Sequence, residues 1–382
     1  MMADNIEHVI SYWMMFQQFH SPALGGFAVV SHWLPFLVFS VPVGALADRF
    51  DPRRLIQCGM LLFIIASLGW GYFFVTNSLQ VWHAMALLVI HGLAGVLWQT
   101  SSQLLVHDIV KPAELQSAVR LNASARYLGI LVGPAVGGLI LLWLGPARGI
   151  FLNVMFYLPL VLWLWKAPYG PRFRLGPATV PRAVRGFADI VQTIRDVAGN
   201  RIIVSMTLLA GAASFFIGNS YHAQMPGFAH DLGHGDPGIS YSMLLAADAS
   251  GALLAGVVLE RLSLLRPNPR TALALALVWA VALGGFALAH NYAVALVLLC
   301  IAGFFELSFS SMAQTLVQVH APVAIRGRVI GLFNMSALGM RAFSGITVGL
   351  AGSLVGVHVS LAISAAVLLL VTGSLWTLTA SE

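Results

Sequence analysis

Long apolar stretches separated by short polar turns dominate this chain of 382 residues. A helix crosses the hydrocarbon core of a bilayer with about 20 apolar residues, and most of these stretches reach that length. The composition agrees, because 59% of the residues are hydrophobic and 9% are charged, which is too little charge to coat a soluble protein. We therefore predict an all-α polytopic membrane protein with room for about eleven or twelve helices.

Basic residues lie mostly on one side of the predicted membrane. Of the 20 Lys and Arg residues, 17 fall at turns on the same side as Asp48, whereas Arg126 and Arg341 fall inside helices and only Arg148 lies opposite. This is the positive-inside pattern, which places the Asp48 side in the cytoplasm. The net charge of +6 therefore reports topology, and no nucleic-acid partner is expected. Cys58 and Cys300 lie in apolar runs and predict no disulfide framework.

The most informative turn spans residues 44–54 and reads GALADRFDPRR. It resembles the signature turn of the major facilitator superfamily between the second and third membrane helices. The matching positions are Gly44, Leu46, Asp48, Arg49 and Arg53. Asp51 and Pro52 replace the usual glycine and basic residue, a departure similar to the drug and siderophore exporter branch, which includes enterobactin exporters.

A second copy of this turn lies 212 positions later. Gly256, Glu260 and Arg261 repeat Gly44, Asp48 and Arg49 in register. The same offset relates Asn122 to Asn334, Ser124 to Ser336, Gly133 to Gly345 and Gly137 to Gly349. A constant offset over this length indicates two copies of one unit, which is the parallel repeat expected of this transporter class. The resemblance thus covers nearly the whole chain and implies the major facilitator fold, with two six-helix bundles.

Apolar length sets the predicted helices and domains. The spans are 24–47, 55–75, 79–106, 117–144, 150–165, 202–228, 237–262, 271–289, 292–319, 327–354 and 357–377. The N-terminal bundle is 1–165, the C-terminal bundle is 202–382, and the linker 166–201 is cytoplasmic. Within the linker, residues 181–197 have apolar side chains at helical spacing and predict a helix along the membrane surface.

We predict that helix 1 is incomplete in this sequence. Residues 6–19 carry Glu7, His8, Gln17 and Gln18 and are too short to cross the bilayer unaided. We interpret the chain as truncated, so that it begins inside helix 1. A naturally short helix 1 is the alternative.

The family resemblance implies a gating role for the charged turns. In the family, the acidic residue of the turn binds the opposite half of the protein and keeps the cytoplasmic side of the transporter closed. Asp48 is then expected near Arg326 and Arg328, at the start of the predicted helix 327–354. Arg53 or Arg54 is expected near Asp108. The predicted gating residues are Gly44, Asp48, Arg49, Arg53, Arg54, Asp108, Glu260 and Arg261. The alternative is that these are solvated turn charges, which suits Asp51 better than Asp48.

The predicted helix 117–144 carries small residues every four positions around a proline. These allow another helix to approach closely, and the proline removes a backbone hydrogen bond and kinks the span. The pattern is similar to a motif of the antiporter branch, and this likeness implies export; ordinary close packing is the alternative. The residues are Gly129, Gly133, Pro134, Gly137 and Gly138.

Four charges are predicted inside the membrane, where each needs a partner or a wet cavity. Counting residues from the cytoplasmic side places Glu306 and Arg341 at similar depth, as expected neighbours. The family resemblance implies that the helices of Asp248 and Arg126 face each other, which brings this second pair within reach. A buried carboxylate with an intermittently available arginine suits proton coupling, so these four residues are the candidates. A static ion pair explains the same residues equally well. His91, a lone histidine in an apolar helix, is expected to be packed and hydrogen-bonded.

The resemblance implies a substrate path lined by the predicted helices 6–19, 79–106, 202–228 and 292–319. Its residues are amphipathic and aromatic, which suits a bulky organic solute. The candidates are Trp98, Gln99, Phe215, Phe216, Asn219, Tyr221, Phe305 and Phe309. The spacing of the histidines and aspartates in the outer turn matches no fixed metal geometry, so we predict a solvated turn and no metal or cofactor. These residues are His222, His230, Asp231, His234 and Asp236.

We therefore predict a monomeric secondary transporter in a bacterial plasma membrane, which exports an amphipathic organic compound in exchange for protons. A proton-coupled importer is the main alternative, and a truncated form that transports nothing is another. A membrane-embedded enzyme is the alternative from a different class. The sequence contains no recognised catalytic signature, so an enzyme is not expected.

Overall fold

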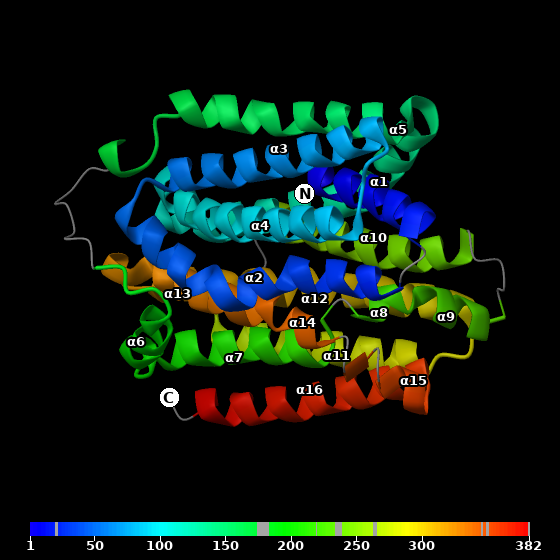
Figure 1. The fold of residues 1–382 in the computed structure, drawn as a ribbon. Coiled ribbons are helices and arrows are strands. Elements are labelled where there is room, and N and C mark those ends of the chain that lie inside the picture. The colour runs from blue at the N-terminus through cyan, green and yellow to red at the C-terminus, as the bar shows by residue number, and fades with distance from the viewer. Residues whose placement is uncertain are drawn as a thin grey trace. The chain divides into compact units, whose positions relative to one another are not determined.

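The computed structural model describes residues 1–19, 22–173, 183–218, 220–233, 239–262, 266–344, 347–348 and 351–380. The elements in these ranges are all helical, which confirms the predicted all-α class (Figure 1). Eight helices within the described ranges are long and apolar enough to cross a membrane.

The chain forms two compact units, and neither is a continuous half of the sequence. The first comprises Met1–Lys111, Leu128–Thr193 and Pro322–Asn334. The second comprises Pro112–Tyr127, Ile194–Ala321 and Met335–Glu382. Each unit therefore contains a short segment from the other predicted bundle, residues 322–334 in the first unit and 112–127 in the second.

Unit 1 is built around α4. This helix packs against α2 and α3, and α13 packs against α2 and α4 (Figure 1). Its elements are α1 (Met2–Phe19), α2 (Pro22–Arg49), α3 (Pro52–Thr76), α4 (Val81–Ile109), the part of α5 (Leu115–Lys166) from Leu128, the part of α6 (Ala188–Val197) up to Thr193, and α13 (Arg326–Asn334).

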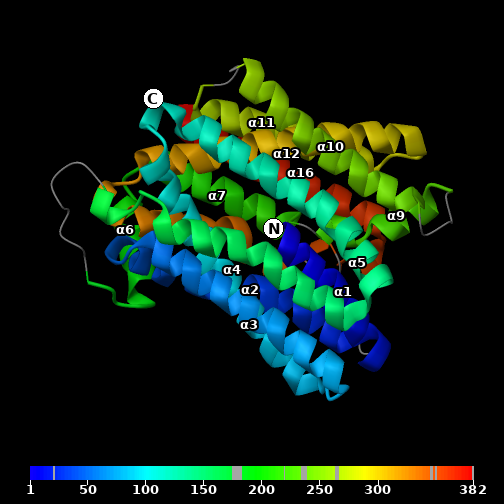
Figure 2. The ribbon, with the colours of Figure 1, turned by 90° about the horizontal axis from the view of Figure 1, so that it is seen from above.

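Unit 2 is built around α11 and α12. Helix α12 packs against α10 and α11, and α16 packs against α11 and α7 (Figure 2). Its elements are the first part of α5, the end of α6, α7 (Arg201–Phe216), α8 (Ser220–Ala223), α9 (Met225–Asp231), α10 (Ile239–Leu262), α11 (Pro269–Ala287), α12 (Tyr292–His320), α14 (Arg341–Ser344), α15 (Ala351–Val355) and α16 (Val357–Ala380).

Helices α2, α3, α4, α10, α11, α12 and α16 lie within a few residues of their predicted spans, whereas two other predicted spans are broken. The predicted helix 202–228 ends at Phe216, and Gly218 has a φ of 49°, which is left-handed and interrupts the helix before α8 and α9. The predicted helix 327–354 is α13 followed by a π-helical turn, Met335–Gly339, and the short α14 and α15. Hydropathy measures apolar length and does not register such backbone breaks.

Two other predictions need smaller changes. The predicted helices 117–144 and 150–165 are the two arms of α5, which meet at Gly145 with a φ of 73° and a ψ of 173°. The predicted surface helix 181–197 is shorter, because α6 begins only at Ala188, and residues 181 and 182 lie outside the described part of the chain. The first helix begins at Met2 rather than residue 6.

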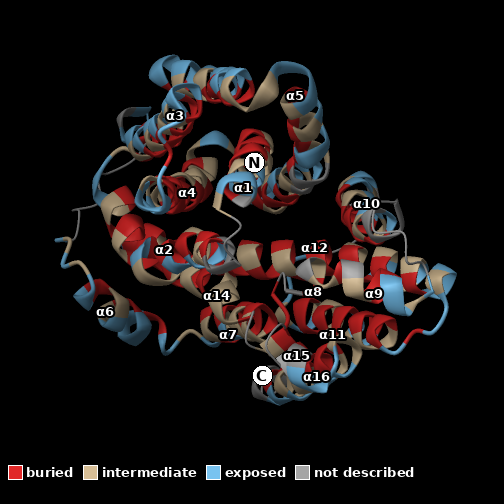
Figure 3. Ribbon diagram, turned by 45° about the vertical axis from the view of Figure 1, so that its right-hand side comes forward, coloured by how far each residue is buried: buried red, intermediate tan, exposed pale blue. Residues whose placement is uncertain are grey.

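The outer surface is rich in apolar side chains, as a lipid-facing surface requires. Pale blue, exposed residues occur along α5 and α16 in Figure 3. They include Trp143, which is 80% exposed, and Leu370, which is 73% exposed. Small residues face inward: a Cβ at Gly303 on α12 would collide with the backbone of Asp248 on α10, and one at Gly251 with the backbone of Cys300.

This packing predicts opposite effects for two Gly→Ala substitutions. Alanine at Gly303 would force α10 and α12 apart, so G303A is expected to destabilise the protein by about 1–3 kcal/mol. At Gly373 on α16 nothing lies within 4 Å of an added Cβ, and G373A is expected to stabilise it by up to about 1 kcal/mol through helix propensity. Thermal unfolding of the purified variants checks both signs. Equal effects would contradict the close contact.

Candidate functional sites

Asp48 binds the first turn of α13. Its carboxylate accepts hydrogen bonds from the backbone N–H of Gly327 and of Arg328, the latter at 3.1 Å, and from Arg328 Nη1 at 3.3 Å. A helix N-terminus favours an anion because its backbone N–H groups have no partner within the helix. The structure thus brings Asp48 to the start of this helix near Arg328, as the family resemblance implies.

Arg328 is the centre of this site and is 1% exposed. Beyond Asp48, its Nε donates to Asp189 Oδ1 at 3.2 Å and its Nη2 donates to the carbonyl of Ala183 at 2.9 Å. Asp189 lies on α6, which comes from the linker, so the linker holds the same arginine as the turn. Sequence reasoning missed Asp189, because the linker pattern indicated only a surface helix.

A second acid site lies in unit 2, at the repeated position. Glu260 accepts hydrogen bonds from Arg120 Nη2 at 2.8 Å, from Arg120 Nε at 3.1 Å and from the Ser117 hydroxyl. Ser117 and Arg120 lie at the start of α5, as Arg328 lies at the start of α13. Asp48 and Glu260 therefore each bind the beginning of a segment that comes from the other half of the sequence.

The repeated glycines explain how these segments come so close. A Cβ at Gly44 would collide with the backbone carbonyl of Gly327, and a Cβ at Gly256 would collide with the side chain of Ser124. A larger residue at Gly44 would therefore have to displace the backbone of α13, whereas one at Gly256 would have to displace the Ser124 side chain. The two acids and the two glycines form the same arrangement twice, once in each unit.

The remaining turn residues have local roles. Asp51 caps α3 by accepting from the backbone N–H of Arg53 at 3.0 Å, and Arg53 Nη2 donates to Asp51 Oδ2 at 2.6 Å. Burial acts to raise the pKa of Asp51, but the hydrogen bonds and charge of Arg53 hold that pKa below its ordinary value. Arg53 Nη1 also donates to the carbonyl of Ala167, and Arg54 donates to Gln57. Asp51, expected to be a solvated turn charge, is instead the helix cap.

The other three predicted gating residues are less enclosed. Arg49 and Arg261 are exposed. Asp108 is half-buried and lines a cavity of about 610 Å³ with Asp48, Lys111 and Arg326. This cavity lies wholly within unit 1.

Tyr221 joins the two predicted coupling acids in unit 2. Its hydroxyl lies 3.3 Å from Asp248 Oδ2 and 3.4 Å from Glu306 Oε2. Asp248 also contacts His222 Nε2 at 3.0 Å. Asp248 is 2% exposed and Glu306 is 7% exposed, so both carboxyls are buried. Arg126 and Arg341, predicted to face these acids, are half-buried and lie in the same unit.

The sequence predicts His222 in the outer turn, whereas the structure places it beside Asp248. His230 and His358 contact Asp231 instead, at 3.2 and 3.4 Å. His234 and Asp236 lie outside the described residues.

The predicted substrate-path residues fall into three groups. Gln99 and Phe309 are buried, and Phe309 packs on Trp279 with ring centroids 4.9 Å apart. Phe216 packs against Phe215, and Phe305 against Phe304, and both are half-buried. Asn219 lies outside the described residues.

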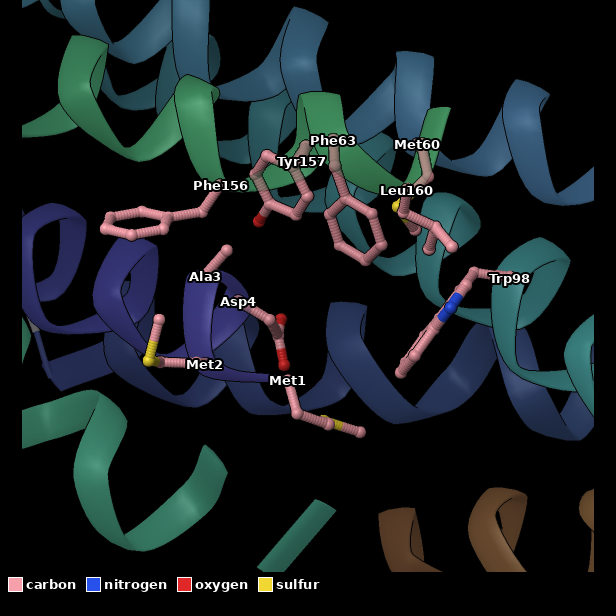
Figure 4. A pocket seen from close by; sticks show the side chains of 10 residues that line it. All are labelled: Met1, Met2, Ala3, Asp4, Met60, Phe63, Trp98, Phe156, Tyr157 and Leu160. Carbon is pink, nitrogen blue, oxygen red and sulfur yellow. The ribbon is translucent and has the colours of Figure 1, made fainter. Parts of the chain in front are cut away.

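Trp98 lines a second cavity, of about 190 Å³, within unit 1. Figure 4 shows its ring at one side of this cavity, with the Asp4 side chain extending from α1 near Phe63 and Tyr157.

The glycine motif of α5 packs against α1. A Cβ at Gly133 would lie 2.6 Å from Asn5 Cβ, one at Gly129 would lie 3.0 Å from Met1 Cβ, and one at Gly137 would lie 3.1 Å from Ile6 Cα. Pro134 lies within α5, and a Cβ at Gly138 would meet nothing within 4 Å. Three of the four glycines therefore allow the close approach that the spacing indicates.

Sequence reasoning missed a buried polar cluster in unit 1. His91 Nε2 lies 2.6 Å from Asp4 Oδ1, and His91 Nδ1 lies 2.8 Å from Glu7 Oε1. The Ser67 hydroxyl donates to Glu7, and the rings of His8 and His32 complete the cluster. A sequence signal exists, because Asp4, Glu7 and His8 share one helix face, whereas Glu7 and His8 enter the sequence-based prediction only as evidence against a full membrane helix.

Comparisons with known proteins agree on the class. Residues 2–380 match the family described as transmembrane secretion effector. The chain is 26% identical over 250 residues to the uncharacterized MFS-type transporter y4rN of Sinorhizobium fredii, covering 63% of this chain and 58% of that protein. It is 29% identical over 120 residues to the candidate multidrug resistance protein MdtD of Cronobacter sakazakii, covering 31% of this chain and 24% of that protein. The chain thus spans less than two thirds of either relative.

Solved structures support the same fold at low sequence identity. The Escherichia coli fucose:proton symporter FucP superposes with a TM-score of 0.72 at 12% identity, covering 98% of this chain and 96% of that chain. The human organic anion transporter MFSD10 gives a TM-score of 0.69 at 14% identity, covering 98% of this chain and 97% of that chain. Together with the family match over nearly every residue, these findings establish that the chain belongs to the transmembrane secretion effector family of major facilitator transporters.

Proposed function

We propose that this transporter exports an amphipathic organic compound in exchange for protons, by alternating access. The observation that carries the proposal is the paired acid site, in which Asp48 and Glu260 each bind a segment from the other half of the sequence. Contacts of this kind act as latches, since they hold one side shut and must break for that side to open. The cytoplasmic side is then the latched side, because the basic turns lie there.

The buried carboxyls of Asp248 and Glu306 are the proposed proton carriers. Both contact the hydroxyl of Tyr221, so a change in the protonation of one alters the hydrogen bond available to the other. Carboxyls within the membrane are energetically costly and usually mark ion or substrate pathways, which supports coupling over simple packing. Arg126 and Arg341, in the same unit, are the proposed countercharges.

Export is favoured over import by two observations. The glycines of α5 pack closely on α1 in the pattern of the antiporter branch. The similarity to MdtD, named as a candidate multidrug resistance protein, points the same way over about a third of the chain. We place the protein in a bacterial plasma membrane as a monomer, with the linker and C-terminus in the cytoplasm.

Everted membrane vesicles with an acidified interior test this function. A fluorescent pH probe reports proton release when candidate toxic organics and siderophores are added. We expect at least one compound to release protons from vesicles that contain the protein and not from vesicles that lack it. If no compound does so, whereas a solute supports growth only in cells that express the protein, the importer is correct.

A further inference from the structure

The buried cluster in unit 1 contains the residues of a transition-metal site. Asp4 and His8 lie on α1, His32 on α2 and His91 on α4, and one ligand atom from each lies within 4.8 Å of the others. Three imidazoles and one carboxylate form a ligand set that Zn²⁺ and neighbouring divalent metals prefer. Asp4 and His91 are buried, and His8 and His32 are half-buried.

The second nitrogen of His91 supplies an independent argument. Its Nε2 faces Asp4 and the other histidines, and its Nδ1 faces Glu7 at 2.8 Å. A histidine that binds metal through one ring nitrogen usually donates the other N–H to a carboxylate, which fixes the ring. Glu7 occupies that position here and is itself held by the Ser67 hydroxyl.

The distances suit an ion after a small adjustment. Around a tetrahedral Zn²⁺ with bonds near 2.0–2.2 Å, neighbouring ligand atoms lie about 3.3 Å apart. Here Asp4 Oδ1 lies 2.6 Å from His91 Nε2 and 3.9 Å from His8 Nε2, on either side of that value. His8 Nε2 is buried and makes no hydrogen bond within the described residues, so this ligand atom is available without breaking a hydrogen bond.

Charge and access are also consistent with a divalent cation. Asp4 and Glu7 place two carboxyl groups in a buried site, where a divalent ion would offset carboxylate charge. Asp4 also lines the 190 Å³ cavity, so this cavity reaches one of the four proposed ligands (Figure 4). We propose that Asp4, His8, His32 and His91 bind one Zn²⁺ or similar ion, with Glu7 orienting His91.

Cobalt binding tests this directly. The purified full chain, with any affinity tag removed and treated with chelator, is titrated with Co²⁺ while its visible absorption is recorded. We expect one equivalent to bind with the spectrum of tetrahedral Co²⁺, and Zn²⁺ to displace it. D4N, H32Q and H91Q should abolish the spectrum. E7Q should keep the ligands but weaken binding by about 10–100-fold, the effect typical of a partner behind a metal ligand.

H83Q is the matched control, because His83 lies on the same helix as His91 and packs on Phe73. It should bind Co²⁺ like the wild type. Size-exclusion profiles show whether each variant is folded, and E7Q preserves the test if a ligand variant is not. The proposal is overturned if the folded wild type takes up no stoichiometric Co²⁺, or if E7Q and D4N bind it as the wild type does. His91 would then be only a cation between two carboxylates.

Discussion

Replacing Asp48 by asparagine is expected to open the latch on α13. The substitution removes a buried charge that binds two backbone N–H groups and Arg328. The loss of hydrogen bonds to a charged group costs about 1–3 kcal/mol, which corresponds to a shift of about 5–150-fold between closed and open forms. Arg328 keeps Asp189 and the carbonyl of Ala183, so the protein should still fold.

A single cysteine reports this opening. Ser40 is 0% exposed, and its backbone lies against Gly331 of α13. With Cys58 and Cys300 replaced by serine, S40C should react with a maleimide from the cytoplasmic side faster in the D48N background, by the same factor. D51N is the control, because Asp51 caps α3 and does not contact α13. Unchanged labelling in D48N would show that Asp48 does not latch this segment.

Replacing Asp248 by asparagine is expected to reduce compound-driven proton release to background. Asparagine keeps the shape and a hydrogen-bond partner for Tyr221 and His222 but cannot bind and release a proton. Exchange of labelled compound for unlabelled compound across the membrane needs no net proton movement, so it should persist. This combination distinguishes lost coupling from lost folding.

E306Q tests the second carboxyl in the same assays, and D231N is the control. Asp231 is 49% exposed and lies at the outer turn, so its loss should leave both activities near the wild-type level. Proton release that survives both D248N and E306Q would remove these residues from the coupling mechanism.

The repeated turn indicated the two acid contacts from sequence. The offset between Asp48 and Glu260 identified two equivalent acids, and the family resemblance indicated which segment Asp48 would meet. Arg120 and Asp189 were not predicted, because their contacts with Glu260 and Arg328 depend on which segments pack together. No local pattern at either residue encodes that arrangement.

The buried clusters were harder to predict because they combine residues from several helices. Depth counting placed Asp248 and Glu306 well inside the membrane, yet it could not show that Tyr221 lies between them. Tyr221 was expected within one continuous helix, whereas the left-handed Gly218 ends that helix earlier. His91 was expected to be packed and hydrogen-bonded, and it is, but its partners Asp4 and Glu7 lie more than eighty residues away.

The direction of coupling is tested most directly in proteoliposomes that contain the purified protein and an exported compound found in the vesicle screen. A proton gradient is imposed in either direction, and the movement of labelled compound is followed. We expect the compound to accumulate inside when the interior is acidic, because protons leave as the compound enters. Accumulation only when the exterior is acidic would show that protons and compound move together, which would contradict antiport and establish a symporter.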